Sequence, residues 1–335
     1  MAPVRTAIIG LGYFGPNLLR NFAAQSDCEM VMACDIKEDH LNKVKRTYPS
    51  VQCTTDAEDI FKDPSIELVL IATPTSAHFP LAKKALESGK HVLIEKPITS
   101  TVAEADELIA LAKKQNLMIF TDHTFCFAPA VEKMASYVEK KDLGDLLYFD
   151  SVRINLGLIQ KDTNVLYDLA IHDLSILSRF MNLRDIRTIT AHGAKYFGAQ
   201  EEVAHLYLEF QSGFTAHIHV SWLSPVKIRQ TILAGKRAML TYDDTEPSEK
   251  LRLYDRGVEH DTTRADPMLP VYRSGDVLIP ALPTKETLAI EADHVLKCIR
   301  EKETPRVSGE AGRDVLQVLE RATESMRTGK TLTFA

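Results

Sequence analysis

The chain is 335 residues long, which is more than one compact core usually organises, so we expect two domains. Apolar residues make up 45% of the chain and charged residues 26%, proportions that exclude a disordered, collagenous or disulfide-stapled protein. The formal net charge is −6, and lysines and arginines are mixed with acids along the chain. This pattern predicts no binding to nucleic acid, which requires a basic surface.

Targeting and cysteine signals predict a cytoplasmic protein without membrane attachment or a metal site. The opening MAPVRTAIIGLG enters a short apolar segment at once, unlike a signal peptide, and no apolar run approaches the length of a membrane span. The cysteines are odd in number, scattered and without a CxxC pair: Cys28, Cys34, Cys53, Cys126 and Cys298. We therefore expect reduced cysteines, with neither a disulfide framework nor a zinc site.

Strands and helices alternate through residues 1–122. Apolar runs predict strands at Arg5 to Ile9, Glu29 to Cys34, Leu68 to Ala72, His91 to Glu95 and Met118 to Thr121. Helical periodicity is expected at Pro16 to Ala24, Glu38 to Tyr48, Pro80 to Ser88 and Val102 to Asn116. Such alternation is typical of a doubly wound parallel sheet with right-handed crossovers. We assign 1–122 to an amino-terminal Rossmann domain of the α/β class.

Residues 123–335 follow a different rhythm. A helix near Ala130 to Lys140 precedes longer strands at Leu147 to Asn155, Val203 to Phe210 and Phe214 to Leu223. In the last of these, apolar and polar side chains alternate, as in a sheet with one covered face. Tyr242 to Pro283 is expected to form hairpins and loops, and helices follow at Lys285 to Arg300 and Glu310 to Thr328. We predict a carboxy-terminal α/β domain with a large open, mostly antiparallel sheet, whose last helix packs back on the first domain.

A glycine-rich loop, GLGYFG, joins the first predicted strand directly to the first helix. In this context Gly10 permits the tight turn, Gly12 lets the backbone approach a pyrophosphate, and Gly15 lets the helix pack closely on its strand. The helix N-terminus favours the phosphate charge. An ordinary glycine-bearing turn is the alternative, but the flanking strand and helix favour a dinucleotide site.

Asp35 lies twenty residues beyond Gly15, at the end of the second predicted strand. A carboxylate there can accept hydrogen bonds from the adenosine ribose hydroxyls and would repel a ribose phosphate, so it favours NAD over NADP. Lys37 partly opposes that repulsion and leaves NADP as the alternative cofactor. The other interpretation of Asp35 is a cap for the following helix.

Two further clusters carry groups suited to proton and hydroxyl chemistry. Lys96 lies between Glu95 and Pro97 at the carboxyl edge of the predicted sheet, where a lysine can orient a substrate hydroxyl and stabilise a developing alkoxide; a solvated loop lysine is the alternative. Asp168 and His172 are four residues apart on one face of a predicted helix, Asn164 to Asp173, and such a pair suits proton transfer. A surface or capping pair is the alternative, and Asp173 is expected to be structural.

Together, GLGYFGPNLLRNF, ATPTSAH, EKP, TDHTFCFAPA and DLAIHD resemble the Gfo/Idh/MocA oxidoreductase family along the whole chain. The segments GYFGPN and NVLYDLAIHDLSIL are most similar to the branch of nucleotide-sugar 3-dehydrogenases and 3-ketoreductases. The resemblance implies that Lys96 assists catalysis and that His172 is the catalytic histidine, with Asp168 beside it.

The resemblance also implies which residues surround the two ligands. Those expected at the cofactor are Gly10, Gly12, Tyr13, Phe14, Gly15, Asp35, Ile36, Thr73, Pro74, Thr75, His78, Glu95, Lys96 and His123, the last where the domains meet. Those expected at the substrate are Arg153, Asn155, Asn164 and His172. For Arg153, a structural salt bridge is an equal alternative. Phe14 stands where many members of the branch have tryptophan and keeps an aromatic side chain near the pyrophosphate.

His217 and His219 are two apart on a predicted strand, a spacing that some metal sites use. No third ligand accompanies them, so we predict no metal. In the family the open sheet commonly mediates dimers and tetramers. We therefore expect this face, extended by Trp222, to form a homodimer or homotetramer interface.

The predicted function is NAD-dependent hydride transfer between the nicotinamide and a secondary hydroxyl or ketone of a sugar, nucleotide-linked and at its 3-position. The enzymatic alternative is an inositol or free-sugar dehydrogenase. A non-catalytic NAD-sensing regulator, of which the family has an example, is disfavoured by the presence of both Lys96 and His172.

Overall fold

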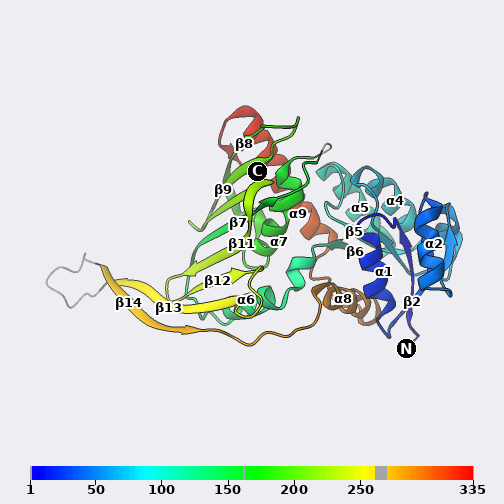
Figure 1. The fold of residues 1–335 in the computed structure, drawn as a ribbon, viewed down its shortest axis with the longest axis horizontal. Coiled ribbons are helices and arrows are strands. Elements are labelled where there is room, and N and C mark those ends of the chain that lie inside the picture. Colours follow the sequence, from blue (N-terminus) through cyan, green and yellow to red (C-terminus); the bar gives the residue numbers. More distant parts are fainter. Residues whose placement is uncertain (1, 161–162, 261–269, 335) are drawn as a thin grey trace. The chain divides into compact units, whose positions relative to one another are not determined.

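The computed structural model describes residues 2–160, 163–260 and 270–334 (Figure 1). Its contacts divide the chain into two units. Met1–Phe127 and Lys285–Gln317 form the first, and Ala128–Thr284 and Val318–Ala335 form the second. Within the described residues, no helix is both long enough and apolar enough to cross a membrane.

A six-stranded parallel sheet, in the order β3-β2-β1-β4-β5-β6, forms the centre of the first unit. Its strands are β1 (Val4–Ile9), β2 (Cys28–Cys34), β3 (Gln52–Thr54), β4 (Leu68–Ile71), β5 (His91–Glu95) and β6 (Ile119–Asp122). The four side chains of β4 are fully buried, as expected of a central parallel strand covered on both faces. The strand order reverses between β1 and β4, the switch point at which doubly wound sheets bind ligands.

Helices connect these strands. They are α1 (Gly15–Ala23), α2 (Glu38–Thr47), α3 (Glu58–Lys62), α4 (His78–Glu87) and α5 (Val102–Gln115), with short 3-10 turns η1 (Thr75–Ala77) and η2 (Thr124–Phe127). A later helix, α8 (Thr287–Glu301), packs against α1 and η2. Its start is held to α1 by Glu286, whose carboxylate accepts hydrogen bonds from both terminal nitrogens of Arg20 at 2.7 and 2.9 Å.

The second unit is built on a nine-stranded sheet in the order β14-β13-β12-β11-β7-β10-β9-β8-β15. Its strands are β7 (Leu146–Leu156), β8 (Ile186–Ala194), β9 (Val203–Phe210), β10 (Thr215–Ser221), β11 (Leu223–Gly235), β12 (Met239–Asp243), β13 (Leu251–His260), β14 (Pro270–Leu278) and β15 (Leu332–Thr333). The β7–β10 pair is parallel and the other pairs are antiparallel. The predicted fold class, a Rossmann sheet followed by a mostly antiparallel sheet, is confirmed.

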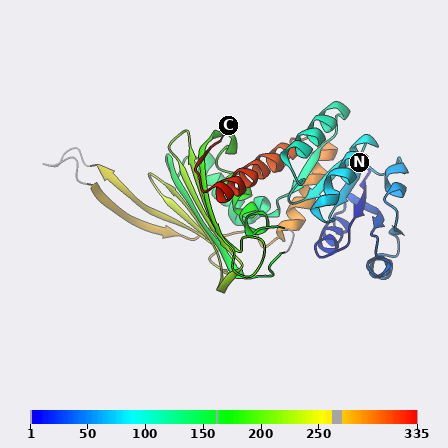
Figure 2. The same cartoon turned by 90° about the horizontal axis from the view of Figure 1, so that it is seen from above.

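Helices lie on one face of this second sheet (Figure 2). They are α6 (Pro129–Glu139), the π-helical turn η3 (Leu166–Ala170), α7 (Ile171–Leu177) and the end of α9 (Gly309–Thr328); a 3-10 turn, η4 (Leu183–Asp185), follows α7. Along β10 the side chains of Ala216, Ile218 and Val220 are buried, so the expected alternation of covered and open faces is present.

Trp222 was expected to extend the open face, but it is only 1% exposed, because its indole packs among the buried side chains and donates to Asp168 at 2.8 Å; that expectation is wrong. Tyr242 to Pro283 contains the β13–β14 hairpin, and residues 261–269 of that segment lie outside the described residues.

Candidate active site

The turn after β1 is shaped by its glycines. Gly10 has φ +96°, and a Cβ there would lie 2.5 Å from the carbonyl oxygen of Ala72, so only glycine fits this close approach to the turn after β4. At Gly12, apart from the glycine itself and its two chain neighbours, no atom of the described residues lies within 4 Å of the place a Cβ would take. The backbone at Gly12 is therefore open to a ligand, next to the N-terminus of α1, which no described side chain caps.

Asp35, directly after β2, accepts three hydrogen bonds. The N–H groups of Leu11 and Lys37 donate to it at 2.7 and 2.8 Å, and Nδ1 of His40 lies 3.0 Å from Oδ2. Burial acts to raise the pKa of Asp35, but the bond to His40 and the two N–H groups outweigh it, so the pKa lies below its ordinary value. Asp35 is thus a carboxylate that ties the glycine turn to α2. The N-cap residue of α2 is Lys37, so the interpretation of Asp35 as that cap does not hold.

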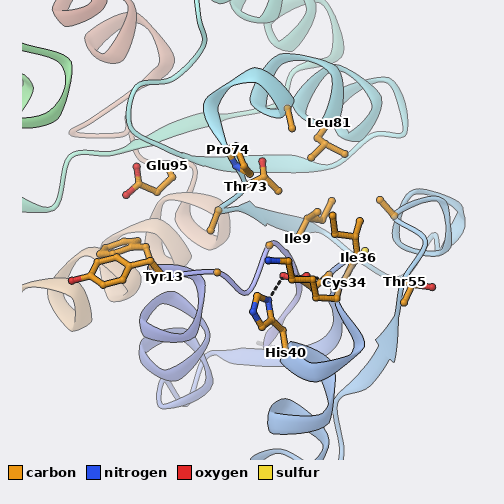
Figure 3. Close-up of a pocket in the computed structure, with 18 of the residues that line it drawn as sticks. Ile9, Tyr13, Cys34, Ile36, His40, Thr55, Thr73, Pro74, Leu81 and Glu95 are labelled. Carbon is orange, nitrogen blue, oxygen red and sulfur yellow. Dashed lines mark hydrogen bonds and ion pairs between the residues drawn. The ribbon is translucent and has the colours of Figure 1, made fainter. Parts of the chain in front are cut away.

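A cleft of about 810 Å³ in the first unit is lined by Gly10, Gly12, Asp35 and His40, among other residues. In Figure 3, Tyr13 and Glu95 lie toward one end of it, and Ile36, Leu81 and Thr55 toward the other. Tyr13 is 98% exposed and Ile36 is 87% exposed. Large apolar side chains left open beside a cleft are suited to covering the flat rings of a bound ligand.

The remaining predicted cofactor residues fall into two groups. Phe14, Thr73, Pro74 and Glu95 line the cleft with Gly10, Gly12, Tyr13, Asp35 and Ile36. The hydroxyl of Thr73 is buried and has no hydrogen-bond partner among the described residues. A buried polar atom without a partner beside a cleft fits a ligand that supplies the partner.

Gly15, Thr75, His78, Lys96 and His123 are not among the residues that line the cleft. His78 was expected to face the cofactor, but it is buried, and its ring nitrogens lie 2.9 Å from the carbonyl oxygens of Thr73 and Pro97. It therefore positions two loops at the cleft and does not face it. Burial lowers the pKa of His78, against the two carbonyls that raise it.

Lys96 follows β5 and forms a cis peptide bond with Pro97. His123 follows β6, and both of its ring nitrogens are buried without a hydrogen-bond partner among the described residues. Burial, assisted by the charge of Lys96, lowers the pKa of His123 to about 3. His123 is therefore a neutral imidazole, and Lys96 is close enough to act on it electrostatically.

In the second unit, the predicted substrate residue Arg153 is committed to an ion pair. It is 3% exposed, and its Nε and Nη2 donate to the two carboxylate oxygens of Asp173 at 2.9 and 3.0 Å. Ser151 also donates to Asp173, at 2.8 Å. This bidentate pair joins β7 to α7, which is the structural alternative left open for Arg153 and agrees with the expected structural role of Asp173.

Asn164 is also occupied by the fold. Its Oδ1 accepts the N–H groups of Leu166 and Tyr167 at 3.1 and 3.4 Å, so the side chain caps the start of η3. Asn164 was expected at the substrate, but its side-chain oxygen binds the backbone of η3 instead.

Asn155 and Asp168 both lie beside Trp222. A Cβ built on Gly157 would be 2.9 Å from Nδ2 of Asn155 and 3.1 Å from the indole of Trp222, and that indole donates to Oδ2 of Asp168. His172, at the start of α7, has a buried Nδ1, and its carbonyl accepts the hydroxyl of Ser175 at 2.7 Å. A cluster of Asn155, Asp168 and Trp222 therefore lies at the end of β7 and β10.

His40 and Trp222 contact the predicted site residues Asp35 and Asp168, although neither residue was predicted to do so. His40 lies five residues after Asp35, on the first turn of α2, a spacing that could have indicated contact. The partner of Asp168 could not be found in this way, because Trp222 is 54 residues away in the chain. Among the described residues, no group of three or more histidine, cysteine, aspartate or glutamate side chains is arranged to hold a metal ion.

Family models match both parts of the chain. The model described as an oxidoreductase family, NAD-binding Rossmann fold, matches residues 4–123, and the model for the carboxy-terminal alpha/beta domain of the same family matches residues 137–334. The chain belongs to the Gfo/Idh/MocA oxidoreductase family. It is therefore an NAD-dependent oxidoreductase, and the predictions of family, enzyme class and cofactor are confirmed.

Individual relatives extend over nearly the whole chain. The scyllo-inositol 2-dehydrogenase (NAD(+)) of Bacillus subtilis is 24% identical, over 97% of this chain and 95% of its own. The UDP-N-acetylglucosamine 3-dehydrogenase of Acidithiobacillus ferrooxidans is 24% identical, over 94% and 95%, and supports the predicted branch. The crystal structure of GenD2 from gentamicin A biosynthesis, in complex with NAD, shares the fold with a TM-score of 0.84 at 18% identity, covering 100% of this chain and 97% of its own.

Proposed function

We propose that this oxidoreductase transfers a hydride between NAD and a secondary hydroxyl or ketone at the 3-position of a nucleotide-linked sugar. The observation that carries the proposal is the similarity to a UDP-N-acetylglucosamine 3-dehydrogenase over 94% of the chain. The chain also has Lys96 and His172 at the positions that the family motifs give to catalytic residues.

The cleft residues fit the dinucleotide. The open backbone at Gly12 and the N-terminus of α1 would hold the pyrophosphate, and Asp35 would accept a ribose hydroxyl. When bound, the nicotinamide accepts or returns the hydride. Tyr13 and Ile36 would cover the bound molecule and exclude water from it.

The protein's own groups would move the proton. His172 takes the hydroxyl proton during oxidation and returns it during reduction, the role for which an imidazole is suited near neutral pH. Lys96 orients the reacting hydroxyl and stabilises the negative charge that develops on its oxygen. Asp168, held by the indole of Trp222, supports the charged form of the imidazole.

The proposal also covers assembly and location. We propose a cytoplasmic homodimer or homotetramer formed through the open face of the second sheet, without nucleic-acid or membrane partners. The net charge of −6 and the mixed distribution of lysine and arginine support the absence of a nucleic-acid partner.

A second candidate function is oxidation of a free polyol. The relative named scyllo-inositol 2-dehydrogenase has the same sequence identity to this chain, 24%, as the UDP-N-acetylglucosamine 3-dehydrogenase. The ion pair of Arg153 with Asp173 removes one group that was expected at the substrate. Inositol and free sugars are therefore the comparison that the test must include.

The test compares kcat/KM for UDP- and dTDP-linked hexoses, including 3-keto forms, with kcat/KM for myo-inositol and free glucose under the same conditions. We expect the nucleotide-linked substrates to be turned over far more efficiently, because binding energy remote from the reacting carbon contributes to the transition state. Higher efficiency with the polyols would reject the nucleotide-sugar assignment. Absence of turnover with every substrate, together with tight NAD binding, would support the regulator alternative.

A further inference from the structure

Two carboxyl groups meet in the interior of the first unit. Asp122 is the last residue of β6 and is 2% exposed, and Glu291 is on α8 and is 1% exposed. The two side chains are in hydrogen-bonding contact with each other. Asp122 lies in the TDHTFCFAPA segment and Glu291 lies in none of the quoted segments. Neither residue has a part in the proposed hydride transfer.

The hydrogen bonds around the two groups are incomplete. Oδ1 of Asp122 accepts the hydroxyl of Thr124 at 2.6 Å. A hydroxyl has one proton, so Thr124 has none left for Glu291. Oδ2 of Asp122 and both oxygens of Glu291 are buried, and no donor among the described residues reaches them. A single proton placed between the two carboxyl groups would supply the missing bond.

Charge leads to the same conclusion. Glu95, at the end of β5 and opposite Asp122 in the parallel register, adds negative charge near Glu291, while Lys96 is the cation that acts on Asp122. The neighbouring imidazole of His123 is neutral, and that of His294 on α8 accepts the N–H of Arg306 at 3.0 Å. Two ionised carboxylates in contact, both buried, would be strongly unfavourable even with the charge of Lys96 nearby.

The proton resides on Glu291. Burial raises its pKa well above the ordinary value, and the charges of Asp122 and Glu95 raise it further. Burial also raises the pKa of Asp122, but Thr124, Glu291 and Lys96 act in the opposite direction. Asp122 is therefore the group that carries the negative charge, and Glu291 is the weaker acid and keeps the proton.

We propose that Asp122 and Glu291 share one proton and act as a positioning pair, which holds one net negative charge within electrostatic reach of Lys96. The shared proton follows from the burial and contacts of the two side chains alone. The positioning of Lys96 rests on the proposed function, in which the Lys96 ammonium orients the substrate hydroxyl.

The shared proton is tested by the pH dependence of stability. A folded state that binds a proton which the unfolded chain releases loses stability as pH rises above the unfolded pKa, by up to about tenfold in the folding equilibrium constant per pH unit. Glu291→Gln replaces the acid by an amide that donates the same hydrogen bond and cannot lose a proton. We expect the melting temperature of this variant to rise relative to the wild type as the pH increases from about 5 to about 8.

Glu286→Gln is the matched control. Glu286 directly precedes α8, but its pKa is lowered to about 2, chiefly by its hydrogen bond from Arg20. The stability that this pair contributes is complete above the unfolded pKa and is lost only as pH falls below it. The control should therefore be destabilised by a constant amount across the same range. A Glu291→Gln difference that is equally constant would overturn the shared proton.

Infrared spectroscopy of the wild-type protein is a second test of the shared proton, and it does not depend on how well the variant folds. At neutral pH we expect the carbonyl stretch of a protonated carboxylic acid, and it should disappear in Glu291→Gln where that variant is folded. A wild-type spectrum at neutral pH with no such band would show that both groups are ionised and would reject the proposal.

The positioning role is tested by a double-mutant cycle on kcat/KM. Glu291→Gln leaves Asp122 as the carboxylate, and Asp122→Asn leaves Glu291 to take the charge, whereas the double variant carries none. We expect the loss in the double variant to exceed the product of the two single losses by about tenfold or more, with NAD affinity preserved. Multiplicative losses would show that the pair does not act on Lys96. If Lys96→Ala is fully active, the proposed function fails, and the stability and infrared results still decide the shared proton.

Discussion

Asp35 uses three of its acceptor sites within the protein. A carboxylate offers about four such sites, and the bonds from Leu11, Lys37 and His40 occupy three of them. One site on Oδ1 therefore remains for a ribose hydroxyl, while a ribose phosphate would meet a carboxylate whose pKa is held low. We expect NAD to bind at least several-fold tighter than NADP, and Asp35→Ser to narrow that preference.

Fluorescence titration of both cofactors measures the preference. His40→Asn is the control, because it removes the imidazole beside Asp35 and leaves the carboxylate in place. Equal or reversed affinities in the wild type would show that Lys37 and His40 dominate the adenosine end of the cleft.

The catalytic residues are tested by truncation. We expect Lys96→Ala and His172→Ala each to lower kcat by about a hundredfold or more, as is typical for loss of a positioned acid or base. Asp168→Ala should cost less, because its carboxylate acts through the imidazole. NAD titration serves as the control, since cofactor binding should survive all three changes. Near-native turnover of His172→Ala across the pH range would make Tyr167 or Lys96 the candidate proton carrier.

For single residues, the sequence predicts which side chains lie at the site better than it predicts which side chains they contact. The strand-loop-helix context placed Gly10, Gly12 and Asp35 at the cleft, because their spacing is imposed by local geometry. The ion pair of Arg153 with Asp173 depends on how α7 packs on β7. That packing is a tertiary property, and the residue types alone left two roles open for Arg153.

Between elements, the Arg153–Asp173 pair joins β7 to α7 in a buried setting. Removing one partner leaves the other charge buried and unpaired, so we expect Arg153→Met to destabilise the folded protein by about 3–5 kcal/mol. Thermal or denaturant unfolding measures the loss, and Arg187→Met is the control, because Arg187 on β8 forms an exposed ion pair with Glu209 on β9. Unchanged stability with a raised KM would instead return Arg153 to the substrate.

Element boundaries were predictable where periodicity was strong. β5 and β9 begin and end at the expected residues, and α1 and α5 agree within one residue at each end. The short β3 carries too few residues for a pattern. The predicted single helix from Asn164 to Asp173 begins as the π-helical turn η3 and continues as α7. Side-chain periodicity does not reveal such a change of helix type.

At the scale of the whole molecule, the open face of the second sheet carries a row of histidines. His192, His205 and His219 are cross-strand neighbours on β8, β9 and β10. The rings of His205 and His219 are stacked, with centroids 4.2 Å apart and 10° between their planes. Burial lowers the pKa of both, and the neighbouring histidines lower it further. Both rings are thus uncharged at neutral pH, and stacking brings no like charges together.

This row of histidines predicts in which direction the assembly of the proposed homo-oligomer changes with pH. Because the pKa of His205 and His219 is lowered in the folded chain, and burial in an interface would lower it further, the assembly is favoured above these pKa values and lost as pH falls through them. We expect sedimentation analysis to find an oligomer at neutral pH that dissociates on acidification before the chain unfolds. The double variant His205→Asn/His219→Asn cannot gain these charges and should remain assembled at the lower pH. If the wild type is a single chain at neutral pH, or if the variant dissociates at the same pH as the wild type, this face is not the interface that the histidines control.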